Sequence, residues 1–284
     1  MTGLAARPLL GERHGQVVLG DANGVAVVHW DPLRRTSRWG RPTRRSRPLR
    51  NFGDLLGPLI VSRLAQGLPR ASGDRRLLAV GSILHFAGPG DVVWGTGLNP
   101  KGPTDATTMG ALDVRAVRGP RTAESLRALG AEVPAVYGDP ALLLPRVFPE
   151  LARRPSSPRH ELTVVPNLND LAPRATFPAG WRRDIVNPRS PMRGILRRIR
   201  DSRLVVGSSL HAIIVAESLG VPARAVATRH EEPFKYEDYY LGTGRDPRGM
   251  LAASVDEAID MGGAPALNWD PGPLLASFPS DLWR

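Results

Sequence analysis

The sequence predicts an α/β fold in which two doubly wound lobes face a cleft. Three observations predict it. Short apolar, β-branched runs alternate with segments of helical spacing along most of the 284 residues. A charged stretch rich in Pro and Ser, residues 153–159, interrupts this alternation as a linker does. Small polar residues follow several of the strands, and ligands of open α/β sheets bind at that edge.

The first lobe is predicted over residues 1–153. It opens with a hairpin of two strands, 17–19 and 25–30, because Asp21-Ala-Asn-Gly24 is a typical turn. Helices are predicted at 51–66, briefly around His85, and at 119–129, where Pro120 occupies a first-turn position that tolerates its missing N–H. The other strands are expected at 77–80, 91–94, 114–117 and 135–137.

The second lobe is predicted over residues 154–284, where the alternation resumes. Its strands are expected at 162–165, 184–186, 204–206 and 224–227. Its helices are expected at 191–200, 210–219 and 254–261, and Gly220 and Pro222 end the second of these. The final segment, 269–284, is apolar enough to pack back on the first lobe.

The composition excludes several classes of protein. No apolar run approaches the roughly 20 residues that span a bilayer, and the N-terminus lacks the features of a signal peptide. The chain has no cysteine, which excludes disulfides and cysteine-ligated metals. We therefore expect a cytoplasmic protein, with peripheral contact to the inner face of the cell membrane as a further expectation.

The net charge of +11 is carried almost entirely by arginine. Lys101 and Lys235 are the only lysines, so 36 of the 38 basic residues are arginine, and a codon bias explains part of this excess. Eight arginines lie within residues 31–50, which have neither helical nor strand period and predict a surface loop. The charge favours an anionic partner: nucleic acid, a phosphorylated metabolite or an acidic membrane.

The segment 203–220 predicts a strand, a tight turn at Gly207-Ser208-Ser209 and a helix that begins near His211. Free N–H groups at such a helix start favour an anion. The other interpretation is that Ser208 and Ser209 cap the helix and that His211 is an ordinary helix residue. Both interpretations stay open on this segment alone.

Known phosphate, hydrolase and metal motifs are absent. The sequence contains no G-x-x-x-x-G-K-[ST], no G-x-G-x-x-G after a strand, no G-x-S-x-G and no H-E-x-x-H, so no metal site is predicted. Arg118 and Arg121 lie at a strand end and in the following helical turn, where guanidinium groups suit phosphate or carboxylate. A solvated helix start is the alternative role for Arg121.

Six short motifs, taken in order, resemble the polysaccharide pyruvyl transferase family over about residues 51–240. They are Asn51-Phe-Gly-Asp54, Gly81-Ser-Ile-Leu84 with Gly95-Thr-Gly97, Val117-Arg-Gly-Pro-Arg-Thr122, Gly138-Asp-Pro-Ala141, Ser208-Ser-Leu-His211 with Ala216-Glu-Ser-Leu-Gly-Val-Pro222, and Lys235-Tyr-x-Asp-Tyr239. The resemblance implies a GT-B-like fold of two Rossmann-like lobes, with the acceptor on the first and phosphoenolpyruvate on the second. It also implies transfer of the pyruvyl group of phosphoenolpyruvate to a saccharide or lipid-linked saccharide as a ketal, with no cofactor beyond this donor.

The resemblance implies roles for particular residues. His211 is expected to act as the acid or to hold the phosphate, and Asp54 is expected to act as a base on the acceptor side. The substrate-binding residues implied are Asn51, Gly53, Ser82, His85, Arg118, Arg121, Ser208, Ser209, Lys235 and Tyr236.

One position departs from the family pattern. Many members have arginine directly before Leu-His, whereas this chain has Ser209, so the anion anchor is either missing or supplied elsewhere, for example by Arg118, Arg229 or Lys235. Two alternative functions remain open: a GT-B-type glycosyltransferase that uses a nucleotide sugar, and a nucleic-acid-binding protein that acts through residues 34–50. The second is disfavoured because a single aromatic residue interleaves these arginines and no nucleic-acid-binding motif occurs.

Overall fold

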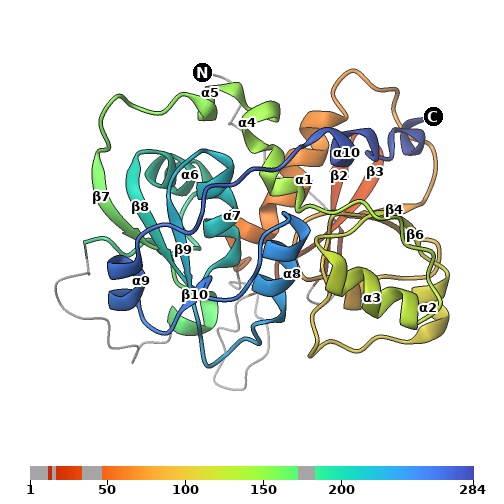
Figure 1. Cartoon of the computed structure of the whole chain (residues 1–284). Helices are drawn as coiled ribbons and strands as arrows, with labels where there is room; N and C mark the ends of the chain where they lie inside the picture. Colours follow the sequence, from red (N-terminus) through yellow and green to blue (C-terminus); the bar gives the residue numbers. More distant parts are fainter. Residues whose placement is uncertain (1–11, 15–16, 34–46, 172–182) are drawn as a thin grey trace.

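The chain is a mixed α/β protein with two sheets that are largely parallel (Figure 1). The computed structural model describes residues 12–14, 17–33, 47–171 and 183–284. Most of the predicted arginine-rich loop, residues 34–46, lies outside the described residues. Among the described residues, no helix combines the length and the apolar character needed to cross a membrane.

The first sheet has six strands in the order β1-β2-β3-β4-β5-β6. The predicted hairpin is confirmed as β2 and β3, and the Asp21 carboxylate accepts a 2.6 Å hydrogen bond from the Gly24 N–H in its turn. Strands β1 to β3 are antiparallel, and β3 to β6 are parallel. The bounds are β1 Glu12–His14, β2 Val17–Ala22, β3 Val25–Trp30, β4 Arg76–Leu78, β5 Val92–Trp94 and β6 Asp113–Ala116.

The second sheet has four parallel strands in the order β10-β9-β8-β7. Their bounds are β7 His160–Val164, β8 Ser202–Gly207, β9 Ala223–Val226 and β10 Leu251–Ala252. Strand order follows sequence order among the named strands of both sheets.

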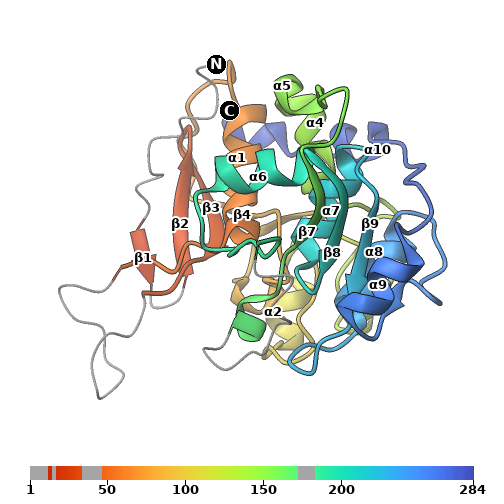
Figure 2. The same ribbon diagram turned by 90° about the vertical axis from the view of Figure 1, so that its left-hand side faces the viewer.

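Helices cover both faces of the second sheet (Figure 2). Val205 of β8 packs into the core beside α6 and α7, while Val206 faces the opposite core, which includes Ala258 of α9. The longer helices are α1 Phe52–Leu64, α3 Pro120–Ala128, α6 Met192–Arg200, α7 Leu210–Ser218, α8 Phe234–Gly242 and α9 Val255–Met261. The short ones are η1 Leu84–Phe86, α2 Ala106–Gly110, η2 Pro140–Leu143, α4 Leu144–Val147, α5 Pro149–Ala152, η3 Leu168–Leu171, α10 Gly272–Ala276 and η5 Ser280–Trp283.

A single apolar core joins the two sheets. It contains Val27 and Leu77 from the first sheet, Ile60 of α1, and Ile213 and Val205 from α7 and β8. Helices α1, η2, α4 and α7 contact one another between the sheets. This continuous packing holds the carboxyl ends of both sets of parallel strands in a fixed relation, while the division at residues 153 and 154 stays a prediction.

Two predicted strands are wrong. Residues 135–137 and 184–186 form only the isolated parallel bridges Val117↔Tyr137 and Val164↔Ile185. Each run lies at the edge of its sheet, where one strand offers hydrogen-bond partners and the described residues form no strand on the other side.

The C-terminal segment contacts the first sheet. The Trp283 indole N–H donates to the Ala22 carbonyl at 2.8 Å, and the Trp94 indole N–H donates to the Leu274 carbonyl at 3.0 Å. The ring of Phe278 stacks on Trp283, with their centroids 5.3 Å apart. These contacts close the apolar core at the end away from the second sheet.

Candidate active site

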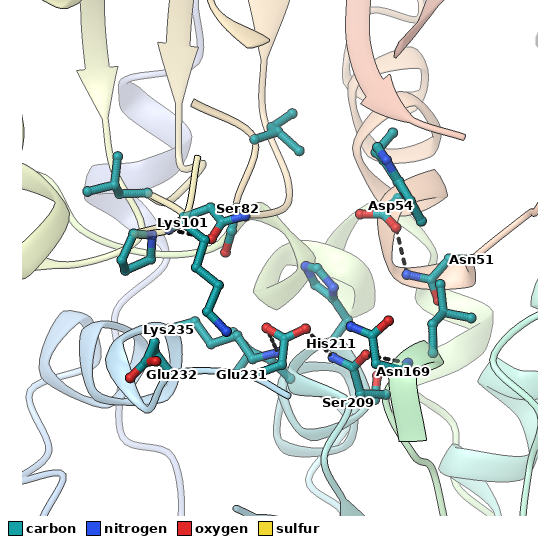
Figure 3. A pocket seen from close by; sticks show the side chains of 18 of the residues that line it. Asn51, Asp54, Ser82, Lys101, Asn169, Ser209, His211, Glu231, Glu232 and Lys235 are labelled. Carbon is teal, nitrogen blue, oxygen red and sulfur yellow. Dashed lines mark hydrogen bonds and ion pairs between the residues drawn. The ribbon is translucent and has the colours of Figure 1, made fainter. Parts of the chain in front are cut away.

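A cavity of about 460 Å³ lies where the carboxyl ends of the two sets of parallel strands meet (Figure 3). This volume is within the range of roughly 300–1,000 Å³ that is usual for small-molecule sites. Of the predicted site residues, the cavity is lined by Asn51, Asp54, Ser82, His85, Ser209, His211 and Lys235. Lining residues that the sequence analysis did not select include Lys101, Asn167, Asn169, Glu231 and Glu232.

The turn before α7 brings His211 to this cavity. Strand β8 ends at Gly207, whose φ of +145° suits glycine, and α7 begins three residues later. Neither Ser208 nor Ser209 caps α7 through its side chain. The Ser208 hydroxyl instead accepts from the Asn167 N–H at 2.9 Å and donates to the Asp170 carboxylate. The capping interpretation of this turn is therefore wrong: the Ser209 side chain makes no capping hydrogen bond to α7 in the described part of the chain.

Tyr236 supports the same turn from behind. Its hydroxyl donates to the Ser208 carbonyl at 2.7 Å, and its side chain is buried. Burial, with Glu231 and Asp170 nearby, raises the pKa of this phenol far above its ordinary value, so the group stays a hydrogen-bond donor. Tyr236 thus holds the turn and does not line the cavity.

The surroundings of His211 disfavour the protonated imidazole, because the ring is largely desolvated and positive charges lie near it. The pKa of His211 is lowered to about 3, chiefly by burial and further by the positive charges of Arg118 and Lys235. Its Nε2 lies 3.8 Å from Asp139 Oδ2, and neither atom has a hydrogen-bond partner among the described residues. In the absence of substrate, His211 is therefore neutral at physiological pH.

Gly53 lets α1 approach the ring of His211. A Cβ atom at position 53 would lie 2.8 Å from Cγ of His211 and 3.0 Å from its Cβ, closer than real Cβ contacts allow. The resemblance implied a substrate-binding role for Gly53, and the structure places it outside the lining of the cavity, against this ring.

Replacing Gly53 with alanine is therefore expected to push His211 out of place. We expect the free energy of unfolding to fall by about 1–3 kcal/mol, the usual effect of overpacking, together with a loss of activity. Urea denaturation and steady-state rates measure the two effects. Gly194→Ala in α6 is the control, because a Cβ there meets nothing within 4 Å. It is expected to stabilise by about 0.5–1 kcal/mol, and equal behaviour of the two variants would contradict the prediction.

Asp54 and Asn51 form a pair on the part of the cavity wall that α1 provides. The Asn51 amide donates to Asp54 Oδ2 at 2.6 Å. Burial raises the pKa of Asp54 to about 7, the Asn51 hydrogen bond lowers it, and the charge of Asp31 raises it. A carboxyl group with a pKa near 7 exchanges a proton readily at physiological pH, as a general base must.

Among the described residues, two cations line the cavity, Lys101 and Lys235, and they are the only two lysines in the sequence. Lys235 Nζ donates to Glu231 at 2.8 Å, and its pKa is lowered chiefly by burial. Lys101 Nζ donates to the His230 carbonyl at 3.0 Å and forms no ion pair within the described part of the chain. Figure 3 shows Lys101 on the same side as Ser82, with Lys235 and Glu231 below it.

Arg118 and Arg121 lie outside the lining of the cavity. Arg118 is fully buried: its Nε donates to Asp238 at 3.1 Å and its Nη1 to the Ser82 hydroxyl at 2.7 Å. Its Nη2 has no partner among the described residues. Arg121 forms an ion pair with Glu237 of α8. Arg118 thus stands directly behind Ser82, and Arg121 ties α3 to α8.

His85 forms the remaining predicted part of the wall. Its ring packs on Phe86, with their centroids 3.9 Å apart, and burial lowers its pKa. Over the described residues, no group of three or more His, Asp or Glu side chains is arranged to hold a metal ion.

Comparison with known proteins decides the family. The family model for polysaccharide pyruvyl transferase matches residues 51–230, a stretch that includes the helix α1 side of the cavity and the turn before α7. The chain belongs to the polysaccharide pyruvyl transferase family. It is therefore a transferase enzyme, and the family predicted from the six motifs is confirmed.

Two individual proteins are similar to this pyruvyl transferase. The succinoglycan biosynthesis protein ExoV of Rhizobium meliloti (strain 1021) is 28% identical over 224 residues, which cover 75% of this chain and 68% of that protein. The crystal structure of a functionally uncharacterised Klebsiella pneumoniae protein matches with a TM-score of 0.47 and 11% identity, covering 72% of this chain and 89% of that one. The structural match supports no conclusion about the chemistry of this site.

Proposed function

We propose that this pyruvyl transferase moves the pyruvyl group of phosphoenolpyruvate to a saccharide and closes it as a ketal across two hydroxyls. The observation that supports this most is the cavity itself, which combines a carboxyl group near neutral pKa, a buried imidazole and two lysines. The donor has a phosphate and a carboxylate, so it needs cations and N–H donors. Lys101, Lys235 and the uncapped start of α7 supply them.

The proposed reaction needs one proton donor and one proton acceptor, His211 and Asp54. His211 gives a proton to the methylene carbon of the donor, and the double-bond electrons form that C–H bond, which leaves C2 electrophilic. A sugar hydroxyl attacks C2 while Asp54 takes its proton. Phosphate then departs with the electrons of its C2–O bond, the second hydroxyl attacks C2 to close the ketal, and the leaving phosphate takes the proton of that hydroxyl. Figure 3 shows the ring of His211 projecting between the Asn51–Asp54 pair and the Ser82–Lys101 side.

The acceptor and the location are proposed on weaker grounds. The name of ExoV refers to succinoglycan biosynthesis, which favours an exopolysaccharide unit or its lipid-linked precursor as the acceptor here. A lipid-linked acceptor would place the enzyme in the cytoplasm beside the inner face of the membrane, with residues 31–50 toward anionic lipid. The GT-B-like arrangement of lobes is part of the same proposal.

Product analysis tests the proposal against its alternatives. Purified protein is incubated with phosphoenolpyruvate and a panel of oligosaccharides, and in parallel with nucleotide sugars. Release of phosphate with a mass gain of one pyruvate ketal on the sugar is the expected result. Release of a nucleoside diphosphate instead would establish a glycosyltransferase, and salt-sensitive binding of nucleic acid without either reaction would establish the third function.

The rate is expected to fall as pH decreases through about 7, because Asp54 must be a carboxylate to accept the hydroxyl proton. Asn51→Ala removes a hydrogen bond that lowers the pKa of Asp54, so the midpoint of this acidic limb is expected at higher pH. Asn169→Ala changes another amide of the cavity wall that does not contact Asp54, and its midpoint should stay in place. Profiles of kcat/KM against pH for wild type, Asn51→Ala and Asn169→Ala measure these midpoints. An unmoved midpoint in Asn51→Ala would contradict the assignment of Asp54 as the base.

Lys101→Met is expected to raise KM for phosphoenolpyruvate by about tenfold or more, since a hydrogen bond to a charged group contributes about 1.5–3 kcal/mol. Lys101 forms no ion pair in the described residues, so its charge is available to the donor. Arg248→Met is the control: it also removes one positive charge, but from a side chain that is 90% exposed and does not line the cavity. If both variants raise KM equally, the effect comes from net charge and not from Lys101.

A further inference from the structure

Asp139 is a buried carboxyl group near His211 that the proposed reaction does not use. It follows the first lobe's last bridge residue, Tyr137, and its side chain has no exposed surface. One carboxylate oxygen, Oδ1, accepts from the Ala141 N–H at 2.9 Å and so caps η2. The other, Oδ2, has no hydrogen-bond partner among the residues that the structure describes, which is rare for a buried oxygen.

This unpartnered oxygen faces the ring of His211. Nε2 of His211 lies 3.8 Å from Asp139 Oδ2. This nitrogen is also buried and also has no hydrogen-bond partner among the described residues. Two orphaned atoms that face each other are brought into a hydrogen bond by a shift of less than about 1 Å. Catalytic hydrogen bonds are often this long in the absence of substrate and shorten when it binds.

The other imidazole nitrogen, Nδ1, faces the first turn of α1. It is the ring atom nearest to the space above Gly53, and the same turn bears Asn51 and Asp54 on the cavity wall. With Nε2 turned toward Asp139, Nδ1 is the nitrogen available to a ligand in the cavity.

We infer that Asp139 is a positioning residue that acts through His211: its carboxyl group and Nε2 share a proton, so that Nδ1 delivers the proton to the bound donor. The inference rests on the proposed function. When Nδ1–H protonates the donor's methylene carbon, Nε2 takes the proton of the Asp139 carboxyl group, which becomes a carboxylate. One proton thus leaves the pair and one C–H bond forms, and the pair is reloaded from solvent after product release.

The electrostatics of the site agree with a shared proton. Burial raises the pKa of Asp139 to about 7, with Arg118 lowering it and Asp238 raising it, while burial, Arg118 and Lys235 lower the pKa of His211. The groups that face the pair are thus Arg118 from the β6–α3 turn and Asp238 and Lys235 from α8. Near neutral pH the extra proton therefore rests on the carboxyl group, and a bound anionic donor favours its transfer to the ring.

The test combines a spectrum that needs no turnover with a kinetic measurement. In ¹⁵N-labelled wild type, the His211 signals are assigned by comparison with His211→Gln. We expect the Nδ1–H tautomer at pH 6 and a shift toward Nε2–H by pH 8, as the Asp139 carboxyl group ionises. In Asp139→Asn, whose amide keeps the Ala141 cap but cannot ionise, no such shift is expected. Identical pH responses in wild type and Asp139→Asn would overturn the inference.

The kinetic arm separates positioning from capping. Asp139→Asn is expected to lower kcat by about 100-fold or more, with little change of KM for phosphoenolpyruvate. Asp139→Ser is a good helix cap but too short to reach His211, so it should fold and show the same loss. Wild-type kcat in Asp139→Ser would overturn the inference. If wild type itself releases no phosphate from phosphoenolpyruvate, the proposed function fails, and the tautomer measurement alone decides the pairing.

Discussion

His211→Gln is expected to lower kcat by about 10²–10⁴-fold, the usual contribution of a positioned proton donor. Glutamine has similar length and can donate a hydrogen bond, but it cannot exchange a proton. The neutral state of His211 in the free enzyme means that the variant removes no buried charge. We therefore expect the protein to fold normally and KM for phosphoenolpyruvate to change little.

Phosphate release under saturating donor and acceptor measures this loss, and thermal unfolding confirms that the variant is folded. His85→Gln is a useful comparison, because His85 lines the same cavity and burial also lowers its pKa. In the described residues His85 forms no ion pair with a carboxyl group and its Nδ1 has no hydrogen-bond partner, so its replacement should affect binding more than kcat. An unchanged kcat in His211→Gln would contradict the assignment of His211 as the general acid.

The low pKa of His211 is compatible with a role as an acid only when the donor is bound. A phosphate and a carboxylate beside the ring oppose the effects of Arg118 and Lys235 and favour the protonated imidazole. Proton transfer is thus coupled to donor binding, which protects the site from losing its proton in the free state. The same coupling predicts that donor analogues with less negative charge leave His211 neutral.

Much of the fold was predictable because its strands are short runs of apolar, β-branched residues. Segments 25–30 and 204–206 fall within β3 and β8, and the helix expected at 51–66 is α1. The one-turn elements η2, α4 and α5 were not predicted, since Pro140, Pro145 and Pro149 interrupt any helical period there. These elements form because of tertiary packing: η2 and α4 contact α1 and α7, and α5 contacts α4 and α6.

The site was predictable to the extent that its residues follow strand ends. Ser82 and His211 belong to motifs that follow the parallel strands β4 and β8, Asn51 and Asp54 belong to the motif that opens α1, and all four line the cavity. Residues such as Asn167 and Glu231 lie in loops without a motif, and they meet the first four only because the shared core fixes the two sheets together. Lys101 could have been selected from the sequence, because a lysine is unusual in a chain whose other basic residues include 36 arginines.

Arg118 illustrates what spacing along the chain leaves undetermined. Its place at a strand end favoured a direct donor contact, whereas the structure pairs it with Asp238, 120 residues away, in the core. Asp238 also accepts from the Thr122 N–H at 2.9 Å and from the Thr122 hydroxyl at 2.6 Å. One carboxylate therefore caps α3 and neutralises Arg118, and this joins α3 to α8.

Arg118→Met is accordingly expected to lower the free energy of unfolding by about 3–5 kcal/mol, because it leaves the buried Asp238 charge without its partner. The double variant Arg118→Met/Asp238→Asn should recover most of this loss. The asparagine oxygen can still accept from the Thr122 N–H, and no buried charge remains unpaired. Urea denaturation of the two variants measures the difference, and equal destabilisation in both would show that lost packing, not the unpaired charge, is responsible.

The stable double variant also tests the role that the resemblance implied for Arg118. The unpartnered Nη2 is the one part of the guanidinium that remains available to a donor oxygen, while Nη1 is occupied by the Ser82 hydroxyl. If Nη2 binds the donor, KM for phosphoenolpyruvate rises strongly even though stability is restored. If Arg118 acts only by orienting Ser82, KM changes slightly, and Ser82→Ala reproduces the change. Since removing Arg118 also removes a cause of the low pKa of His211, the double variant should in either case raise that pKa, which NMR titration measures.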